Sequence, residues 1–149
     1  MSESLHAGQM LARAETETGL SDYGDPTLPH RFGLVVDHLN SLAMHEAGRR
    51  QAQAVCHGLL TSRLEFFADR LRHPVADEVI EAPMFVTGEP RSGTTLMHAL
   101  MSVNPEARAL RFWEVMYPSP PPGLAGPDDP RRARADADWH EINTLMPKW

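Results

Sequence analysis

The sequence lacks several features that would mark other classes of protein. Cys56 is its single cysteine, which excludes an internal disulfide and favours a reducing, cytoplasmic compartment. No apolar run is long enough to cross a bilayer, and the acidic N-terminus has no apolar core of a secretory signal. The formal net charge of -6 provides no overall basic surface, so bulk binding to nucleic acid is not expected. Any site for an anion must therefore be built locally, from arginines and backbone amides.

The composition is that of a soluble globular protein. The chain has 149 residues, a length that is enough for one domain. Of these residues 42% are hydrophobic and 23% charged, a composition that argues against disorder. Its 13 prolines are the unusual feature. Six of them fall between Pro118 and Pro130, where neither a regular helix nor a central strand can form. We expect an irregular, rigid loop there.

Hydrophobic periodicity predicts that residues 1–80 form a helical region. One helix is expected to end near Gly19, a second to begin near His30 or Arg31, and a longer third to cover about 49–71 before His73-Pro74 stops it. Cys56 lies on the apolar stripe of the third helix and is interpreted as a core residue rather than a nucleophile. His38 and His45 have no third ligand nearby, so no metal site is expected.

The remaining residues, 81–149, have a mixed pattern. The short apolar runs at 84–86 and 107–110 are predicted to be buried strands, with a helix from Gly93 or Thr94 between them and a last helix over about 130–145. This order predicts an α/β domain of the P-loop-containing nucleotide-binding fold, with a parallel sheet in three layers. Because only two strands are expected, we interpret the domain as incomplete.

Residues 88–95, GEPRSGTT, join the first predicted strand to the helix after it. A loop in this position directs backbone N–H groups and the helix dipole at one point, which suits an anion. Gly88 permits a tight turn, and Gly93 lets the backbone approach a ligand closely. The side-chain donors that would complete a cradle for phosphate or sulfate are Arg91, Ser92, Thr94 and Thr95.

The glycine spacing matches the first part of the Walker A pattern, but the lysine of that pattern is missing. Thr94 stands in its place, and Thr95 stands where the pattern has its metal-binding hydroxyl. A kinase or NTPase would lose its main cation on the β- and γ-phosphates. A P-loop kinase or NTPase therefore stays as an alternative that the absent lysine disfavours.

The run PRSGTTL resembles the 5′-phosphosulfate loop of sulfotransferases that use 3′-phosphoadenosine 5′-phosphosulfate (PAPS). The chain is most similar to bacterial members in which this run is followed by a W-E dipeptide and a proline cluster, here Trp113-Glu114 and YPSPPP. The resemblance covers most of residues 18–138. It implies PAPS as sulfuryl donor, no metal, and a small-molecule acceptor. The residues that it assigns to the 5′-phosphosulfate are Arg91, Ser92, Gly93, Thr94 and Thr95.

The resemblance also implies a reaction, the transfer of a sulfuryl group to an acceptor hydroxyl or amine. Arg91 would stabilise charge on the leaving oxygen. Glu114 is the predicted base because it follows the second predicted strand, and the carboxyl ends of strands in α/β sheets meet at the ligand crevice; His98 is the competing base. Glu89 departs from the small or apolar residue expected before the proline.

The part of the family that grips the 3′-phosphate of PAPS is expected beyond Trp149. We therefore interpret the chain as the N-terminal portion of such an enzyme. A truncated fragment that only binds anions or a partner is a further alternative, and the sequence indicates no oligomeric state. An incomplete sheet should also expose apolar surface.

Overall fold

The computed structural model describes residues 4–145, and every regular element in that range is a helix. The chain divides into two compact units. The N-terminal unit comprises Met1–Pro74 with Pro118–Ala125, and the C-terminal unit comprises Val75–Tyr117 with Gly126–Trp149. Within the described range, no helix is both long and apolar enough to cross a membrane.

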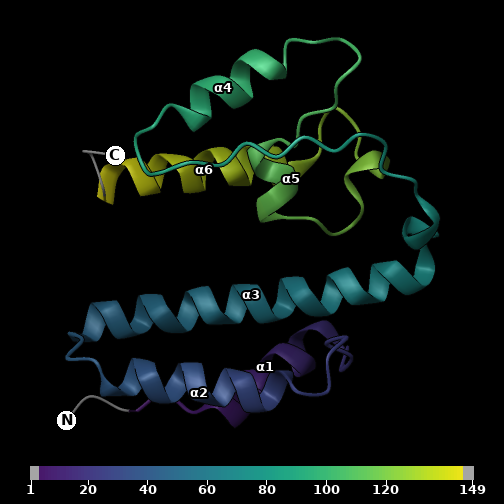
Figure 1. Ribbon diagram of the computed structural model, residues 1–149. Coiled ribbons are helices and arrows are strands. Elements are labelled where there is room, and N and C mark those ends of the chain that lie inside the picture. The colour runs from purple at the N-terminus through teal and green to yellow at the C-terminus, as the bar shows by residue number, and fades with distance from the viewer. Residues whose placement is uncertain (1–3, 146–149) are drawn as a thin grey trace. The chain divides into compact units, whose positions relative to one another are not determined.

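Three helices build the N-terminal unit, and α1 packs against both α2 and α3 (Figure 1). Their bounds are α1 Ala7–Thr18, α2 Leu28–Ser41 and α3 Glu46–Arg72, and the short 3-10 helix η2 covers Pro122–Leu124. The predicted stop signals act as expected. Gly19 adopts a left-handed φ of 66° and its N–H bonds to the carbonyl of Glu15, while α3 ends at Arg72 and is capped by His73, directly before Pro74.

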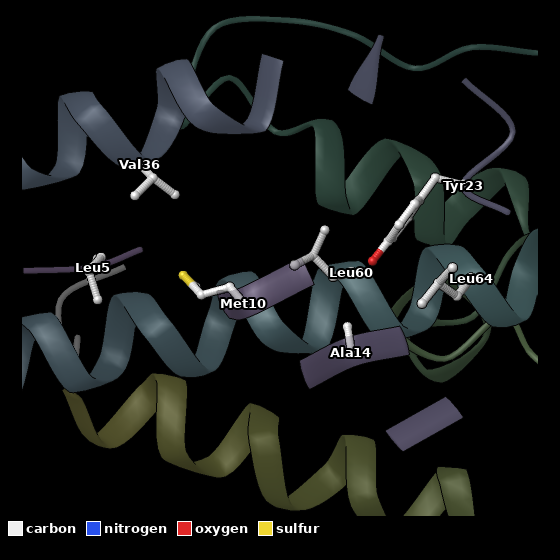
Figure 2. Packing of buried hydrophobic residues seen from close by; sticks show 7 residues of the cluster. All are labelled: Leu5, Met10, Ala14, Tyr23, Val36, Leu60 and Leu64. Carbon is white, nitrogen blue, oxygen red and sulfur yellow. The ribbon is translucent and has the colours of Figure 1, made fainter. Parts of the chain in front are cut away.

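The core of the N-terminal unit is a contiguous cluster of buried side chains (Figure 2). Cys56 packs at its edge, as its place on the apolar stripe predicted, and burial raises the pKa of its thiol. Arg63 donates from Nε to the carbonyl of Tyr23 at 2.8 Å, which ties α3 to the loop after α1. The buried members of the cluster are Leu5, Met10, Ala14, Tyr23, Val36, Leu60 and Leu64.

The C-terminal unit contains α4 Thr94–Met101, α5 Phe112–Met116, α6 Pro130–Leu145 and the 3-10 helix η1 Val75–Asp77. Helix α5 packs on α6, and Trp113 is buried there with the guanidinium groups of Arg131 and Arg132 at 5.0 and 4.5 Å from its ring centroid. Asp129 caps α6, because its Oδ1 accepts the Arg131 N–H at 2.9 Å. This unit is held by cation–π and charged contacts as much as by apolar packing.

The predicted three-layer α/β fold with a parallel sheet is wrong for the described residues. Residues 84–86 and 107–110 are irregular there, and no strand forms between residues 4 and 145. A strand exists only where a neighbour pairs with its N–H and C=O groups, and neither segment has such a neighbour in the described chain. The run interpreted as a buried strand is instead open to solvent, with Met84 72% and Phe85 86% exposed.

Candidate functional site

The loop at 88–95 is a tight turn that leads directly into α4. The Ser92 N–H bonds to the carbonyl of Glu89 at 3.1 Å, and α4 begins at Thr94. Arg91 and Gly93 have left-handed φ values of 69° and 87°. A non-glycine residue in this region carries backbone strain of roughly 1–3 kcal/mol, and such strain gathers at ligand sites. The backbone thus curls around the end of α4, whose first N–H groups have no partner within the helix.

Gly88 lies close to the side chains of Ser92 and Thr94 in the same turn. A Cβ built on Gly88 would lie 2.6 Å from Ser92 Oγ and 3.1 Å from Thr94 Cγ2. Real Cβ atoms hardly ever come that close to another heavy atom, so a side chain at 88 would push the Ser92 and Thr94 side chains away. The glycine therefore allows the loop to fold back on itself.

The side-chain donors of the loop are free. Within residues 4–145 the side chains of Arg91, Ser92, Thr94 and Thr95 make no hydrogen bond or ion pair, and all but Thr94 are exposed. Glu89 forms no ion pair with Arg91 in the described chain, so its carboxylate does not neutralise the guanidinium. Free hydroxyl and guanidinium donors at a helix N-terminus form the kind of arrangement that holds an oxyanion.

Glu114, the predicted base, is engaged in local contacts. It lies in the first turn of α5, where Oε2 accepts the backbone N–H of Arg111 at 2.8 Å. Its other oxygen accepts from Arg108 Nη2 at 3.1 Å, and the side chain is only 10% exposed. In the part of the chain that the structure describes, no hydrogen bond joins it to the loop at 88–95. The geometry is that of a capping carboxylate, whereas His98 on α4 is exposed.

The sequence prediction missed the buried charge pair of this unit. Arg131 donates from Nε and Nη2 to the two carboxylate oxygens of Asp129 at 2.9 and 2.8 Å, and from Nη1 to the carbonyl of Tyr117 at 2.9 Å. These bonds lower the pKa of Asp129 to about 2. The run Asp129-Pro130 carried the signal, since Asp at the cap and Pro at the first position start a helix. Among the described residues, no group of three His, Cys, Asp or Glu is arranged to hold a metal ion.

Comparison with known proteins identifies the part of the chain that contains the loop. Residues 83–149 match the family model described as the sulfotransferase family. The crystal structure of sulfotransferase STF1 from Mycobacterium tuberculosis H37Rv is similar to this chain, with a TM-score of 0.78 and 27% sequence identity over 99% of this chain. Residues 83–149 are therefore similar to the sulfotransferase family. The resemblance predicted from PRSGTTL is thereby confirmed.

The sulfotransferase match has a limited extent. It covers 42% of the mycobacterial chain, so the present chain spans less than half the length of that sulfotransferase. None of the curated proteins compared with the chain matches it.

Proposed function

We propose that the loop at 88–95 holds the 5′-phosphosulfate group of PAPS, and that the activity to which it contributes is sulfuryl transfer to a hydroxyl or amine of a small-molecule acceptor. The observation that carries this proposal is the set of unpaired donors on Arg91, Ser92, Thr94 and Thr95 at the start of α4. The set lies inside the segment that matches the sulfotransferase family. A cytoplasmic location belongs to the same proposal.

The donors suit a phosphosulfate better than a metal-bound triphosphate. Thr94 occupies the position at which a kinase or NTPase loop has the lysine for its β- and γ-phosphates. The only cation in the loop is Arg91, which offers a planar fork of donors to oxyanions. A sulfonate carries less charge than a γ-phosphate, so the reaction needs no metal ion to neutralise it.

In the proposed reaction the bond between sulfur and the bridging oxygen of the phosphosulfate breaks, and a bond from sulfur to the acceptor oxygen or nitrogen forms. The electron pair of the broken bond stays on the bridging oxygen, which leaves as part of adenosine 3′,5′-bisphosphate. Arg91 and the N–H groups at the start of α4 would stabilise that developing charge. The acceptor gives up one proton to a base as the new bond forms.

Glu114 remains the proposed base, with His98 as the alternative. Both oxygens of Glu114 already accept hydrogen bonds, from Arg111 and Arg108. To accept a proton from the acceptor, Glu114 must release at least one of these contacts. His98 needs no such release, because its exposed ring makes no hydrogen bond in the described chain. Glu114→Gln and His98→Gln, compared in one turnover assay, separate the two assignments.

Anion binding without turnover is the second candidate function. It is favoured by the extent of the match, since this chain spans only 42% of the mycobacterial sulfotransferase. Under this hypothesis the loop binds adenosine 3′,5′-bisphosphate, but the chain transfers no sulfuryl group from PAPS. A turnover assay with PAPS and a panel of phenols and amines distinguishes the two functions.

Calorimetric titration of the chain with adenosine 3′,5′-bisphosphate, and separately with ATP and Mg²⁺, tests the proposed ligand. We expect binding of the bisphosphate and a loss of about tenfold or more in Arg91→Ala, because a hydrogen bond to a charged group contributes about 1.5–3 kcal/mol. Arg72→Ala is the matched control, since Arg72 pairs with Asp69 near the end of α3. Binding of ATP that requires Mg²⁺, or unchanged affinity in Arg91→Ala, would contradict the proposal.

A further inference from the structure

The N-terminal unit contains a cavity that the loop at 88–95 does not line. Its volume is about 660 Å³, and its lining comes from residues 4–13 around α1 and residues 46–57 of α3. Sites for small molecules usually measure roughly 300–1,000 Å³, so the cavity has the size of a ligand site.

The lining carries an excess of positive charge. Arg13, Arg49 and Arg50 line the cavity, against the single carboxylate of Glu46. Glu46 is already ion-paired with Arg50 along α3. Arg13 and Arg49 have no carboxylate partner among residues 4–145. The cavity therefore presents two uncompensated guanidinium groups.

Arg49 is held in place by the fold. It donates from Nη1 to Asn40 Oδ1 at 3.1 Å, and the Asn40 side chain bonds both the N–H and the carbonyl of Leu5 at 2.9 Å. The Nε of Arg49 is buried and has no hydrogen-bond partner. A buried donor without an acceptor is costly, and few occur in folded proteins. The bond to Asn40 fixes the side chain of Arg49, which lines the cavity.

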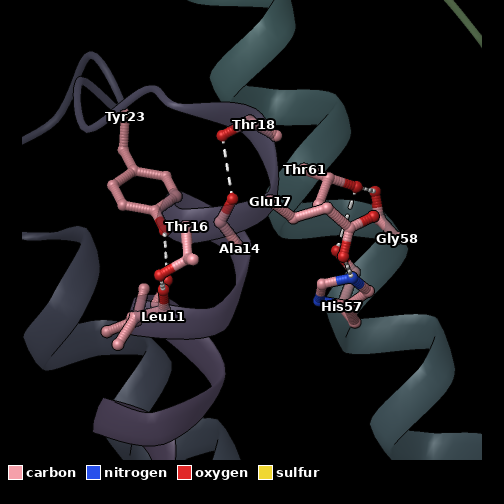
Figure 3. Close-up of polar contacts among 10 residues, drawn as sticks. Leu11, Ala14, Thr16, Glu17, Thr18, Tyr23, His57, Gly58 and Thr61 are labelled. Atoms are coloured by element: carbon pink, nitrogen blue, oxygen red, sulfur yellow. Dashed lines mark hydrogen bonds and ion pairs between the residues drawn. The ribbon is translucent and has the colours of Figure 1, made fainter.

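His57 shows the same pattern on the next part of α3. Its Nε2 lies 2.8 Å from Glu17 Oε2, and the ring is 17% exposed (Figure 3). Because the carboxylate of Glu17 accepts, Nε2 carries the hydrogen of this bond. The Nδ1 atom is buried and has no partner. With Nε2 carrying the hydrogen, Nδ1 is a hydrogen-bond acceptor that the fold leaves unused, on a ring that lines the cavity.

We propose that this cavity binds a small molecule that carries an oxyanion, with the oxyanion on Arg13 and Arg49 and a second polar group on His57. The oxyanion can be a sulfate, a phosphate monoester or a carboxylate. The rest of the ligand molecule fills the remaining space of the cavity. No residue of the proposed phosphosulfate loop lines the cavity, because every lining residue lies at or before position 57.

Titration of the full chain with phenyl sulfate, phenyl phosphate and benzoate tests the proposal, with benzyl alcohol as the neutral probe. At least one anionic probe should bind, and its affinity should rank well above that of benzyl alcohol. Arg49→Gln should weaken that binding about tenfold or more. Arg13→Gln, which changes an exposed side chain on α1, should weaken it in the same direction. Comparison of the three anionic probes identifies which oxyanion the cavity prefers.

Two control variants locate the binding. Arg31→Gln removes one charge from α2 outside the cavity and should leave the affinity of the probe unchanged. Repeating the titrations in the Arg91→Ala background removes any binding of the probe at the loop, and the binding that depends on Arg13 and Arg49 should persist there. Arg49 helps to position Asn40, so circular dichroism must confirm that Arg49→Gln is folded, and Arg13→Gln tests the site without that contact. Equal binding of benzyl alcohol, no binding of any anionic probe, or wild-type affinity in both Arg13→Gln and Arg49→Gln would overturn the proposal.

Discussion

The two units of the molecule differ in how many hydrophobic side chains they bury. In the N-terminal unit, apolar side chains from all three helices meet in one contiguous core. In the C-terminal unit, Trp113 and Ala135 are the only buried hydrophobic residues among those described, and Trp113 is covered by arginines. The first unit is therefore stabilised mainly by removal of apolar surface from water, whereas the second depends on a few charged and cation–π contacts.

The contrast is sharpest at α4, the helix that follows the candidate loop. Its apolar residues Leu96, Met97 and Leu100 are all exposed, and Leu100 is 61% exposed. Contiguous apolar surface of this kind marks an interaction site or a tendency to aggregate. The sequence led us to expect exposed apolar surface, although on a strand rather than on this helix. The loop with the candidate donors is thus attached to the less well packed part of the chain.

Removal of a core side chain should give the largest difference between the units. Leu64 is fully buried in the N-terminal core, so Leu64→Ala should lower the free energy of unfolding by about 2–5 kcal/mol. Leu100→Ala in α4 removes an exposed side chain and should change it by less than about 0.5 kcal/mol. Urea denaturation followed by far-ultraviolet circular dichroism measures both values. Comparable losses in the two variants would show that α4 is covered and would remove the contrast.

Two glycines with left-handed backbone give a second, smaller comparison. Gly24 has a φ of 70°, and a Cβ at that position would lie 1.9 Å from the Phe67 ring of α3. Gly93 has a φ of 87°, but a Cβ there meets no atom within 4 Å. Gly24→Ala combines backbone strain with a clash in the N-terminal unit and should cost roughly 2–4 kcal/mol. Gly93→Ala carries the strain alone and should cost roughly 1–2 kcal/mol.

The same urea denaturation experiment measures both glycine variants. Gly33→Ala, on α2, is the control, because a Cβ there meets nothing and the backbone is helical, so it should be neutral or slightly stabilising. An equal cost at Gly24 and Gly93 would mean that Phe67 moves aside freely, and that the N-terminal core is less rigid than its packing indicates.

The parts of the fold that the sequence predicted are those set by local signals. Glycine, proline and capping residues set these boundaries. They end α1 before Gly19 and α3 before His73-Pro74, and they start α4 and α6. The strands were not predictable in the same way, because a strand depends on a partner elsewhere in the chain and a three-residue apolar run does not specify one.

In the candidate site, too, the features set by local sequence were predicted and those set by tertiary structure were not. The position of the loop before α4 and the sulfotransferase resemblance could be inferred from PRSGTTL alone. Glu114 was chosen because a strand was expected before it, and the structure instead places it in the first turn of α5. The cavity of the N-terminal unit was not foreseen, because Arg13 of α1 and Arg49 of α3 line it together, and only tertiary packing brings residues of these two helices to one cavity.

Acid should act on the C-terminal unit through one carboxylate, and this is the smallest of the expected effects. Arg131 holds the pKa of Asp129 at about 2, below the ordinary value of 3.8. A lowered folded-state pKa means that the ionised carboxylate stabilises the unit fully above pH 3.8, and that this contribution is lost as the pH falls toward about 2. Asp129→Asn should therefore be less stable than the wild type at neutral pH, and the difference should vanish near pH 2.

The indole signal of Trp113 in NMR spectra reports on this transition, because its ring lies against Arg131 and Arg132. Asp136→Asn, an exposed change on the same helix that touches no such pair, is the matched control and should follow the wild-type acid profile. Amide exchange in α3 should be little affected over the same range, since the core of the N-terminal unit is apolar. An Asp129→Asn profile that coincides with the wild type at every pH would show that the Asp129–Arg131 pair does not hold α5 against α6. The C-terminal unit would then need another source of stability, and its exposed apolar residues would be the first place to look for it.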